Sequence, residues 1–568
     1  MNLLSGEMTK HDLLKKYFGH DEFREGQAEI INSIICGRDS LAIMPTGAGK
    51  SVCYQIPALM FDGITIVISP LISLMKDQVG SIQQSGIPAA FINSSLSHYE
   101  YNETLQDAVD NKFKIIYVAP ERLSTESFIR FANIAKISMI AVDEAHCVSQ
   151  WGQDFRPSYI KITDFIEKLS YRPVISAFTA TATTEVRDDI ISILKLVNPF
   201  LITTGFDRRN LYFEVRRPKS KFPELCNILM KHENNSGIIY CLTRKNVEEV
   251  CENLNAAGYN ATRYHAGLND YERMKNQDDF IYDRKTIMVA TNAFGMGIDK
   301  SNVSFVIHYS MPKNLENYYQ EAGRAGRDGE KADCILLYNG QDVHTNQYLI
   351  ENSLPNPVIS PFERDEIKQR DRDRLKQITY YCNIQTCLRS FILKYFGENA
   401  PPRCGYCSNC SPTSTVKTTF EDIPQFKERN IDNDLLLLLK RLRKEIADKE
   451  KVPADNILTD ASLHDMCDKL PRSLADMSTI SGVGSVKLKN YGQKFINVIR
   501  KYTDEISITS VYETTFMDHG KVWTDIEDAQ LIEEYNKGVH PKEIARVHKR
   551  PVDEITSRID ELDLEWSF

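Results

Sequence analysis

Short apolar, β-branched runs alternate with longer amphipathic stretches over the first third of the chain. The runs are DSLAIM, ITIVIS, KIIYVA, MIAVDEAH and PVISAF, all between residues 39 and 178. Runs of this length, separated by helix-sized segments, are typical of βαβ units whose strands form a parallel sheet. The same rhythm restarts with GIIYCL at 237–242 and continues to ADCILLY at 332–338. The pattern therefore predicts an α/β fold with two tandem parallel sheets.

The strand pattern divides the chain into units. The sheets predict a first unit over 1–205 and a second over 206–345, and four smaller segments follow at 346–411, 412–430, 431–503 and 520–568. A charged helical stretch and clustered cysteines mark the first of these segments. The second is polar and contains prolines, which is typical of a linker. The third is predicted to be all-helical. In the fourth, Thr524 and Glu527 are spaced as a capping box, and we expect three short helices resembling a helix-turn-helix.

Composition and charge narrow the class of protein. The chain has 568 residues, 42% hydrophobic and 26% charged, which excludes global disorder and allows several cores. It contains no run of about 18 apolar residues, and its start lacks the segments of a signal peptide. We therefore expect a cytosolic protein without a membrane segment. Because the net charge is −9, nucleic acid must be bound by local grooves rather than by a basic surface overall.

A glycine-rich turn, MPTGAGKS, follows the first predicted strand and precedes a helix-compatible stretch. It is one residue short of the full phosphate-binding pattern, because Met44 stands at the first glycine. Backbone N–H groups at a helix start suit phosphates, Lys50 suits the β and γ phosphates, and the Ser51 hydroxyl suits Mg²⁺. A chance Gly-Lys-Ser turn is the alternative. The backbone contacts to ATP are expected from Thr46, Gly47, Ala48 and Gly49.

Two charged pairs complete the predicted nucleotide site. Asp143 and Glu144 end the strand MIAV, where Asp143 suits ordering of the Mg²⁺ shell and Glu144 suits activation of water. Alone, this pair is also compatible with an acidic cap at a helix start. In the second sheet, glycines flank Arg324 and Arg327, which suit a charge clamp on the γ phosphate. The alternative is a surface loop with exposed arginines. A nucleotide between two lobes explains why the chain has two sheets.

Four of the thirteen cysteines have the spacing of a metal site. They read C-x16-C-x2-C-x2-C, which suits tetrahedral Zn²⁺ bound by Cys387, Cys404, Cys407 and Cys410. A four-cysteine iron–sulfur cluster stays open as the alternative, and a disulfide is disfavoured in a cytosolic chain. Cys382 is a spare thiol nearby. The other cysteines are scattered singly, as reduced core cysteines are.

These motifs resemble the RecQ DNA helicases of helicase superfamily 2, over about residues 5–411 and again over 431–502. The matching segments, in order, are FREGQ, MPTGAGKS, SPLISLMKDQV, DEAH, TATA, AFGMGIDK and QEAGRAGRDG. The resemblance implies two RecA-like lobes, a helical zinc-binding subdomain and a helical HRDC-like domain. It also implies ATP-dependent unwinding of DNA in the 3′ to 5′ direction, in recombination and repair. The TAT of the third motif and the Gln-Glu of the sixth favour DNA over RNA.

The resemblance extends the list of nucleotide contacts. It implies that Arg24 and Gln27 hold the adenine and that Gln320, at the start of the sixth motif, belongs to the site. It puts Arg327 first as the arginine finger. His20 stands where relatives often carry an aromatic residue, and a neutral imidazole still stacks on adenine.

A loop directly after DEAH resembles the aromatic-rich loop of the family. Trp151 and Phe155 can stack on bases and Arg156 can pair with a phosphate, which allows binding of single strands without sequence preference. The alternative is that both aromatic residues belong to an interlobe core. Because the loop follows the DEAH segment directly, contact with DNA could alter the position of Glu144 in the hydrolysis site.

The C-terminal part departs from many family members. They carry a winged-helix domain after the zinc unit, where this chain has only the short segment 412–430. In the HRDC-like part, the Gly-Val-Gly turn before Lys487 and Lys489 can approach a phosphate chain, and a purely structural or protein-contact role is the equal alternative. Residues 551–568 hold six acids and one arginine, so we expect the tail to contact a protein rather than DNA.

These features are compatible with three functions. The leading hypothesis is an ATP- and Mg²⁺-dependent DNA helicase acting on single-stranded and on tailed or branched duplex DNA. The second is a DNA-stimulated ATPase that remodels or anneals DNA with little unwinding, which the missing winged helix favours. The third, a non-catalytic scaffold, is disfavoured by the intact charged residues. We expect a cytoplasmic, nucleoid-associated protein in a bacterium or a nuclear protein in a eukaryote, with no membrane partner.

Overall fold

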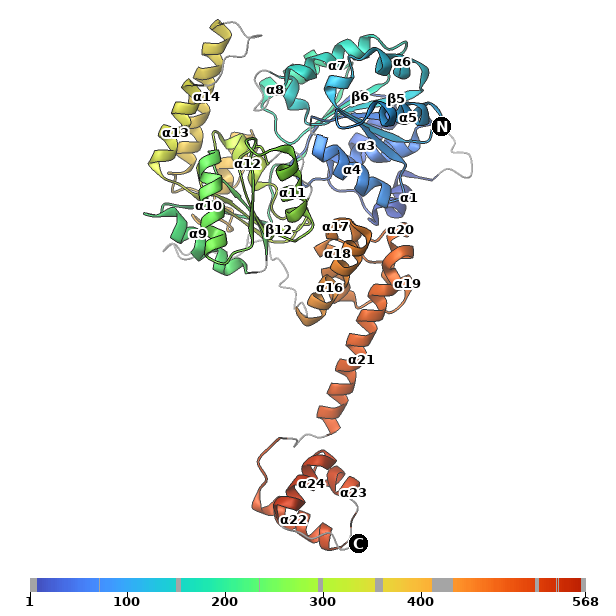
Figure 1. Cartoon of the computed structure of the whole chain (residues 1–568), viewed down its shortest axis with the longest axis vertical. Helices are drawn as coiled ribbons and strands as arrows, with labels where there is room; N and C mark the ends of the chain where they lie inside the picture. The colour runs from blue at the N-terminus through green and yellow to red at the C-terminus, as the bar shows by residue number, and fades with distance from the viewer. Residues whose placement is uncertain are drawn as a thin grey trace.

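The structure is a computed structural model of the chain (Figure 1). It describes residues 8–70, 72–149, 155–233, 235–294, 300–352, 361–410, 433–515, 520–537, 539 and 541–562. The predicted linker 412–430 therefore lies outside the described residues.

The first lobe is a seven-stranded sheet with helices on both faces. Its strands run in the order β3-β4-β2-β5-β6-β1-β7, and every neighbouring pair is parallel. The strands are β1 (Ser40–Ile43), β2 (Ile64–Ile68), β3 (Ala89–Ile92), β4 (Ile115–Val118), β5 (Ile137–Val142), β6 (Val174–Thr179) and β7 (Phe200–Thr203). The helices are α1 (Lys10–Leu13), η1 (Leu14–Phe18), α2 (Gln27–Ile35), α3 (Lys50–Met60), α4 (Ile72–Gln84), α5 (His98–Val109), α6 (Glu126–Ile134), α7 (Pro157–Glu167) and α8 (Thr184–Ile193), with short 3₁₀ turns η2 (Pro120–Arg122) and η3 (Ala145–Val148).

The second lobe repeats this plan with a six-stranded parallel sheet. Its order is β10-β11-β9-β12-β13-β8. The strands are β8 (Leu211–Arg216), β9 (Ser236–Tyr240), β10 (Ala261–Tyr264), β11 (Ile287–Ala290), β12 (Val303–His308) and β13 (Ala332–Leu337). The helical elements are α9 (Lys221–Leu229), η4 (Met230–His232), α10 (Arg244–Ala256), α11 (Asp270–Ile281), α12 (Leu315–Ala322) and α13 (Gly340–Glu351). The predicted α/β fold with two tandem parallel sheets is confirmed.

Burial on both faces explains why the strands are apolar throughout rather than alternating. In β2, Ile66 packs into one core of the first lobe and the next residue, Val67, packs into the core on the opposite face. Helices cover both faces of a parallel sheet, so neither set of side chains meets water. The same arrangement brings the carboxyl ends of the strands to one edge of each sheet, where ligands of such folds bind.

The zinc-binding subdomain is built onto the second lobe. It contains α14 (Pro361–Tyr381), which runs beside α13, and α15 (Leu388–Tyr395) (Figure 1). Tyr381 and Leu388 share one buried cluster with Phe213 of β8 and Tyr318 of α12. The Ser408 N–H also donates to the Phe213 carbonyl at 2.9 Å. Subdomain and lobe therefore form one continuous core.

The HRDC-like region is an all-helical unit with its own core. Its helices are α16 (Asn433–Glu450), α17 (Ala454–Ile457), α18 (Asp460–Lys469), α19 (Leu474–Met477), α20 (Ser485–Lys487), η6 (Leu488–Gly492) and α21 (Gln493–Thr515). Leu439, Leu463 and Phe495 are fully buried among them. The unit touches both lobes: the Gly482 N–H donates to the Gly19 carbonyl at 3.0 Å, and the Ser301 N–H of the second lobe donates to Asp455 at 3.1 Å.

The Gly-Val-Gly turn of this unit faces the first lobe. A Cβ atom added to Gly484 would lie 2.8 Å from the carbonyl oxygen of Lys16, and one added to Gly19 would lie 2.5 Å from the backbone nitrogen of Val483. The glycines thus allow two backbones to pack closely. The turn therefore packs against the first lobe of the same chain.

The tail forms a small three-helix unit beyond α21. Its helices are α22 (Asp525–Asn536), α23 (Pro541–Val547) and α24 (Val552–Glu561), and the predicted capping box of Thr524 and Glu527 is present. Arg550 is buried with its guanidinium 4.4 Å from the Trp523 ring centre. Residues 563–568, which include two of the six predicted acids, lie outside the described residues.

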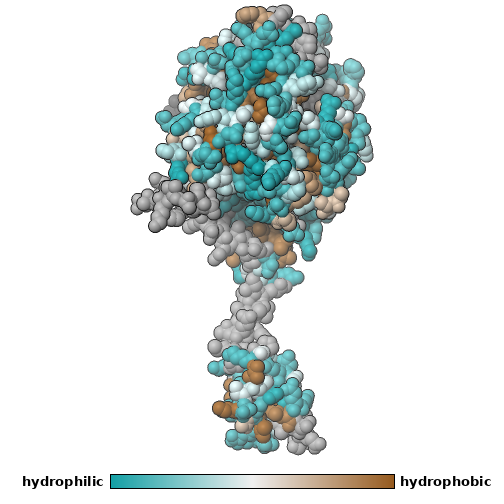
Figure 2. All heavy atoms as spheres, turned by 90° about the vertical axis from the view of Figure 1, so that its left-hand side faces the viewer, coloured by the Kyte–Doolittle hydropathy of each residue, from teal (hydrophilic) through white to brown (hydrophobic). Residues whose placement is uncertain are grey.

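The face of the molecule drawn in Figure 2 is largely polar. On the face shown in Figure 2, hydrophilic residues dominate the lobes, and hydrophobic residues are scattered among them. Among the described helices, none combines the length and the apolarity needed to cross a bilayer.

Candidate nucleotide cleft and metal centre

The glycine-rich turn connects β1 to α3 and has the backbone expected for phosphate binding. Gly47 and Gly49 adopt φ values of +86° and +81°, which side chains disfavour. Gln27 supports the turn from α2: its Nε2 donates to the carbonyls of Ala48 at 2.9 Å and Gly49 at 3.1 Å. The Gln27 Oε1 accepts from the Arg24 N–H at 2.9 Å. The amide of Gln27 therefore holds the turn itself.

Lys50 begins α3 and lies among opposite charges. Its Nζ donates to the Met44 carbonyl at 3.1 Å. Burial lowers the pKa of Lys50, while the carboxylates of Glu144 and Asp143 act in the opposite direction. Arg327 of the second lobe lowers the same pKa, so residues of both lobes act on one ammonium group.

Asp143 and Glu144 follow β5 directly, at the carboxyl edge of the first sheet. Glu144 is held in the left-handed region, with φ of 46°, and its N–H donates to Asp143 Oδ1 at 3.0 Å. Strained backbone at a residue other than glycine persists where the surroundings enforce it, often at functional sites. His146 lies between Glu144 and Thr179. Its Nδ1 is 3.4 Å from Glu144 Oε2 and 2.9 Å from Thr179 Oγ1. The DEAH and TATA segments are thus in direct contact.

The second lobe closes the site. Arg324 and Arg327 follow α12, and they reach the cavity that contains Lys50 and both carboxylates. The cavity measures about 260 Å³ and is lined by Arg24, Thr46, Gly47, Gly49, Lys50, Ser51, Gln78, Asp143, Glu144, Ser301, Gln320, Arg324 and Arg327. Eleven of these residues are among those singled out from the sequence. The structure thus brings four positive side chains, Arg24, Lys50, Arg324 and Arg327, around a space suited to a polyanion.

The cavity lining and the residues singled out from the sequence do not coincide fully. Gln27 and Ala48, both expected to contact nucleotide, support the turn without lining the cavity. Gln78 of α4 and Ser301 line the cavity and were missed. Both belong to or adjoin quoted motifs, SPLISLMKDQV and AFGMGIDK, so motif membership was the available signal. Neither has a side chain whose chemistry alone singles it out.

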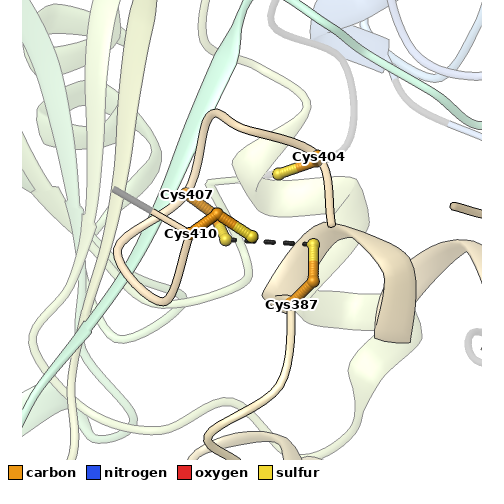
Figure 3. Close-up of side chains that lie close together, drawn as sticks. All are labelled: Cys387, Cys404, Cys407 and Cys410. Atoms are coloured by element: carbon orange, nitrogen blue, oxygen red, sulfur yellow. Dashed lines mark hydrogen bonds between the residues drawn. The ribbon is translucent and has the colours of Figure 1, made fainter. Parts of the chain in front are cut away.

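The four predicted cysteines meet in one cluster. Their sulfur atoms all lie within 4.8 Å of one another, and Figure 3 shows them facing a common centre. Tetrahedral Zn²⁺ with bonds of about 2.3 Å requires sulfur separations of about 3.8 Å, which this cluster fits. The Cys407 Sγ lies 3.9 Å from the Cys387 Sγ. Cys382 is buried in the neighbouring core and is not part of the cluster.

Backbone N–H groups contact two of the sulfur atoms in the cluster. The Ser390 N–H donates to the Cys387 sulfur at 3.4 Å, and the Tyr406 N–H donates to the Cys404 sulfur at 3.3 Å. Hydrogen bonds from Cys404 and Cys407 hold the pKa of Cys387 far below its usual range, and the bond to Cys387 raises the pKa of Cys407 to about 11. Four thiolates so close together need a cation, which is the chemistry of a structural zinc site.

Only part of the predicted DNA-binding loop is described. Trp151 lies outside the described residues. Phe155 is half-buried, and Arg156 donates through Nη1 to the Pro70 carbonyl at 2.8 Å. Pro70 is the second residue of the SPLISLMKDQV segment, so Arg156 ties the loop after DEAH to that segment.

Comparisons with known proteins agree with this architecture. Four family patterns match in chain order: DEAD/DEAH box helicase at 24–190, helicase conserved C-terminal domain at 220–329, RecQ zinc-binding at 340–411, and HRDC domain at 432–499. The lobes, the cleft and these matches define a helicase enzyme that uses ATP and carries zinc.

Two bacterial relatives are similar along almost their whole length. The chain is 37% identical to the ATP-dependent DNA helicase RecQ of Bacillus subtilis (strain 168), over 86% of this chain and 98% of the relative. It is 34% identical to the protein of the same name from Haemophilus influenzae, over 87% and 96%. It is 42% identical to the RecQ-like DNA helicase BLM of Xenopus laevis, over 73% of this chain and 31% of that relative. The chain belongs to the RecQ family of ATP-dependent DNA helicases.

Proposed function

We propose that this protein couples ATP hydrolysis to 3′ to 5′ movement along single-stranded DNA and thereby unwinds tailed or branched duplexes in recombination and repair. One observation carries the proposal. Lys50, Asp143 and Glu144 of the first lobe share a single cavity with Arg324 and Arg327 of the second. A nucleotide bound there contacts both lobes, so its hydrolysis changes their relative position.

Each charged residue has a distinct role in this proposal. Lys50 and the backbone of the turn hold the phosphates, and Arg24 and Gln320 bind the nucleotide at the edges of the cavity. Glu144 positions and activates the attacking water, with His146 beside its carboxylate at 3.4 Å. Arg327, with Arg324 next to it, stabilises the charge that develops on the transferred phosphoryl group.

The proposed site also suits Mg²⁺. The Ser51 hydroxyl and the Asp143 carboxylate line the same cavity and are oxygen ligands of the kind this ion prefers. When bound, the ion would neutralise phosphate charge during hydrolysis. The chain's own contribution is to place these two oxygens beside Lys50.

Contact with DNA is proposed to reach this site through the loop after DEAH. Trp151 and Phe155 are expected to stack on bases, and Arg156 is expected to contact a phosphate or to hold the loop on Pro70. His146 contacts Thr179 at 2.9 Å, so the segment that carries Glu144 is joined to the TATA segment. We therefore expect movement of the loop to shift the position of Glu144.

A remodelling ATPase with weak unwinding is the second candidate. It is favoured by the short segment 412–430, where many family members carry a winged helix. In both cases the zinc cluster has a folding role, because four cysteine ligands would fill a tetrahedral Zn²⁺ shell and leave no open position, and because the cluster adjoins the lobe core.

We further propose that the tail contacts a protein. Its α24 has acidic residues in the first turn, and Val522, Ile526 and Val547 of this unit are exposed by 89%, 74% and 61%. Exposed apolar side chains among acids suit a protein surface rather than phosphates. We expect the protein with the nucleoid in a bacterial cytoplasm, or in the nucleus of a eukaryote.

Strand displacement on 3′-tailed and 5′-tailed duplexes tests the proposal. With ATP and Mg²⁺, release of only the 3′-tailed strand is expected, and Lys50→Ala is expected to abolish it. No release from either substrate, with ATP hydrolysis still stimulated by single-stranded DNA, would establish the remodelling ATPase instead. Equal release from both would contradict the proposed direction.

A further inference from the structure

Arg208 joins the two halves of the nucleotide cleft. It lies between β7 and β8, where the chain passes from the first lobe to the second, and it is half-buried. Its Nη1 donates to the Thr46 carbonyl at 2.5 Å and to the Gly323 carbonyl at 3.2 Å. Its Nη2 donates to the carbonyls of Ala325 at 3.0 Å and Gly326 at 2.7 Å. One guanidinium therefore holds four backbone oxygens.

These oxygens belong to the two turns that matter for hydrolysis. Thr46 is part of the phosphate-binding turn of the first lobe, and Gly326 directly precedes Arg327 in the second. The N–H groups of a guanidinium lie in a fixed plane, so bonds to both turns set the distance and angle between them. A Cβ atom on Gly47 would lie 2.9 Å from Arg208 Nη1, so glycine is needed there for this close approach.

The neighbouring Asn210 reinforces one end of this link. Its Nδ2 donates to the carbonyls of Gly326 at 2.9 Å and Glu330 at 2.7 Å. A Cβ atom on Gly326 would lie 2.4 Å from that nitrogen. The side chains of Arg208 and Asn210 therefore hold the turn that presents Arg327.

Arg389 of the zinc-binding subdomain bonds Asp207 and Arg208. Its Nη1 donates to Asp207 Oδ1 at 2.7 Å and to the Arg208 carbonyl at 2.6 Å. Its guanidinium also hydrogen-bonds the Cys404 side chain, and it lies two residues after Cys387. Arg389 is 5% exposed, so these bonds are protected from water. A continuous set of contacts runs from the cysteine cluster to the cleft.

We propose that Arg208 is a positioning residue for ATP hydrolysis, which sets Arg327 against the phosphate-binding turn, and that Arg389 fixes Arg208 in place. This inference rests on the proposed roles of Lys50 and Arg327. Arg208 belongs to the second lobe and Thr46 to the first, so their bond exists only when the lobes are closed together. It therefore contributes to the closed, hydrolysing state more than to nucleotide binding.

The test compares the purified full-length zinc-loaded protein with its Arg208→Ala and Arg208→Lys variants, in ATP hydrolysis stimulated by single-stranded DNA. We expect kcat of Arg208→Ala to fall by about 100-fold, because a misplaced catalytic group costs about that much. The apparent KM for ATP is expected to change by less than about threefold, since the arginine does not bind the nucleotide. The kcat of Arg208→Lys should lie between those of Arg208→Ala and the wild type, because an ammonium cannot bond both turns in one plane.

Three readouts separate positioning from a purely structural role. Guanidinium chloride at low millimolar concentration should partly restore Arg208→Ala, whereas sodium chloride should not. In a double-mutant cycle, Arg208→Ala should cost little when Arg327→Ala is already present, because both act through one group. Zinc content and melting temperature should match the wild type. The exposed neighbour Arg209 gives the matched control, and Arg209→Ala should keep full activity.

The opposite results would overturn the inference. They are a kcat of Arg208→Ala within about threefold of wild type, full additivity with Arg327→Ala, or loss of zinc and folding without rescue by guanidinium. Failure of the proposed function looks different: the wild-type protein itself would show no ATP hydrolysis stimulated by DNA.

Discussion

The Gly482 N–H donates a hydrogen bond of 3.0 Å to the Gly19 carbonyl, which joins the HRDC-like unit to the first lobe. Gly19 has φ of +72°, and its missing side chain leaves room for the backbone of Val483. The HRDC-like unit also bonds Ser301, a residue that lines the nucleotide cavity. It therefore rests on both lobes beside the cleft.

Gly19→Ala should break the hydrogen bond between the Gly482 N–H and the Gly19 carbonyl. The added Cβ atom would lie 2.5 Å from the Val483 nitrogen, so one of the two backbones must move. Hydrogen exchange of the Gly482 amide should become faster by at least about tenfold, the effect of losing about 1.4 kcal/mol of protection. Gly37→Ala is the matched control: it has φ of +77° and open space around it, so it carries the same backbone strain and should leave that amide protected. Equal exchange in both variants would contradict the contact.

His20 should make folding sensitive to mild acid. Burial, followed by the charges of Arg24 and Lys487, lowers the pKa of His20 from 6.5 to about 4. Between these values the unfolded chain binds a proton that the folded chain does not, so stability falls as pH drops through this window. Going from about pH 7.5 to about pH 5.5 should cost about 1.4 kcal/mol relative to His20→Asn.

The measurement is the unfolding free energy of both proteins at the two pH values. The difference between wild type and His20→Asn should shift against the wild type in acid. Lys15 also lowers this pKa and Asp21 raises it, so the sign belongs to the whole surroundings. A difference that stays constant with pH would show that His20 titrates normally in the folded protein.

Loss of zinc should destabilise the second lobe along with the subdomain. Cys407 and Phe213 form a backbone bridge, and residues of α14 and α15 share the core of that lobe. Cys404→Ser is expected to lose the metal and to lower the melting temperature, because removal of a structural metal typically costs several kcal/mol. Cys382→Ser, outside the cluster, should retain one zinc per chain by elemental analysis. Full zinc content in Cys404→Ser would show that Cys404 is not a ligand.

Residues with distinctive chemistry at short, fixed spacing were recognisable from the sequence. Lys50, Asp143 and the four cysteines belong to this group, since each motif brings its own local geometry. The alternation of apolar runs likewise predicted both sheets, because strands buried on both faces need uninterrupted apolar residues.

Residues that act through tertiary contacts could not be recognised in this way. Arg208 bonds four backbone carbonyls and the side chain of Asn210, and nothing in FDRRNL shows which of its arginines turns inward. The hydrogen bonds of the Gln27 amide to the phosphate-binding turn likewise depend on how α2 packs against that turn. The position of the Gly-Val-Gly turn depends on Gly19, which lies 463 residues earlier in the chain.

The most direct test of the account measures whether the second lobe completes the nucleotide site. Wild type and Arg327→Ala are compared in ATP hydrolysis with single-stranded DNA and in affinity for a fluorescent ATP analogue, with Lys50→Ala as the inactive reference. We expect kcat to fall by about 1,000-fold in Arg327→Ala, as for removal of an arginine finger, with affinity within about threefold of wild type. Unchanged hydrolysis by Arg327→Ala would contradict a site completed by the second lobe.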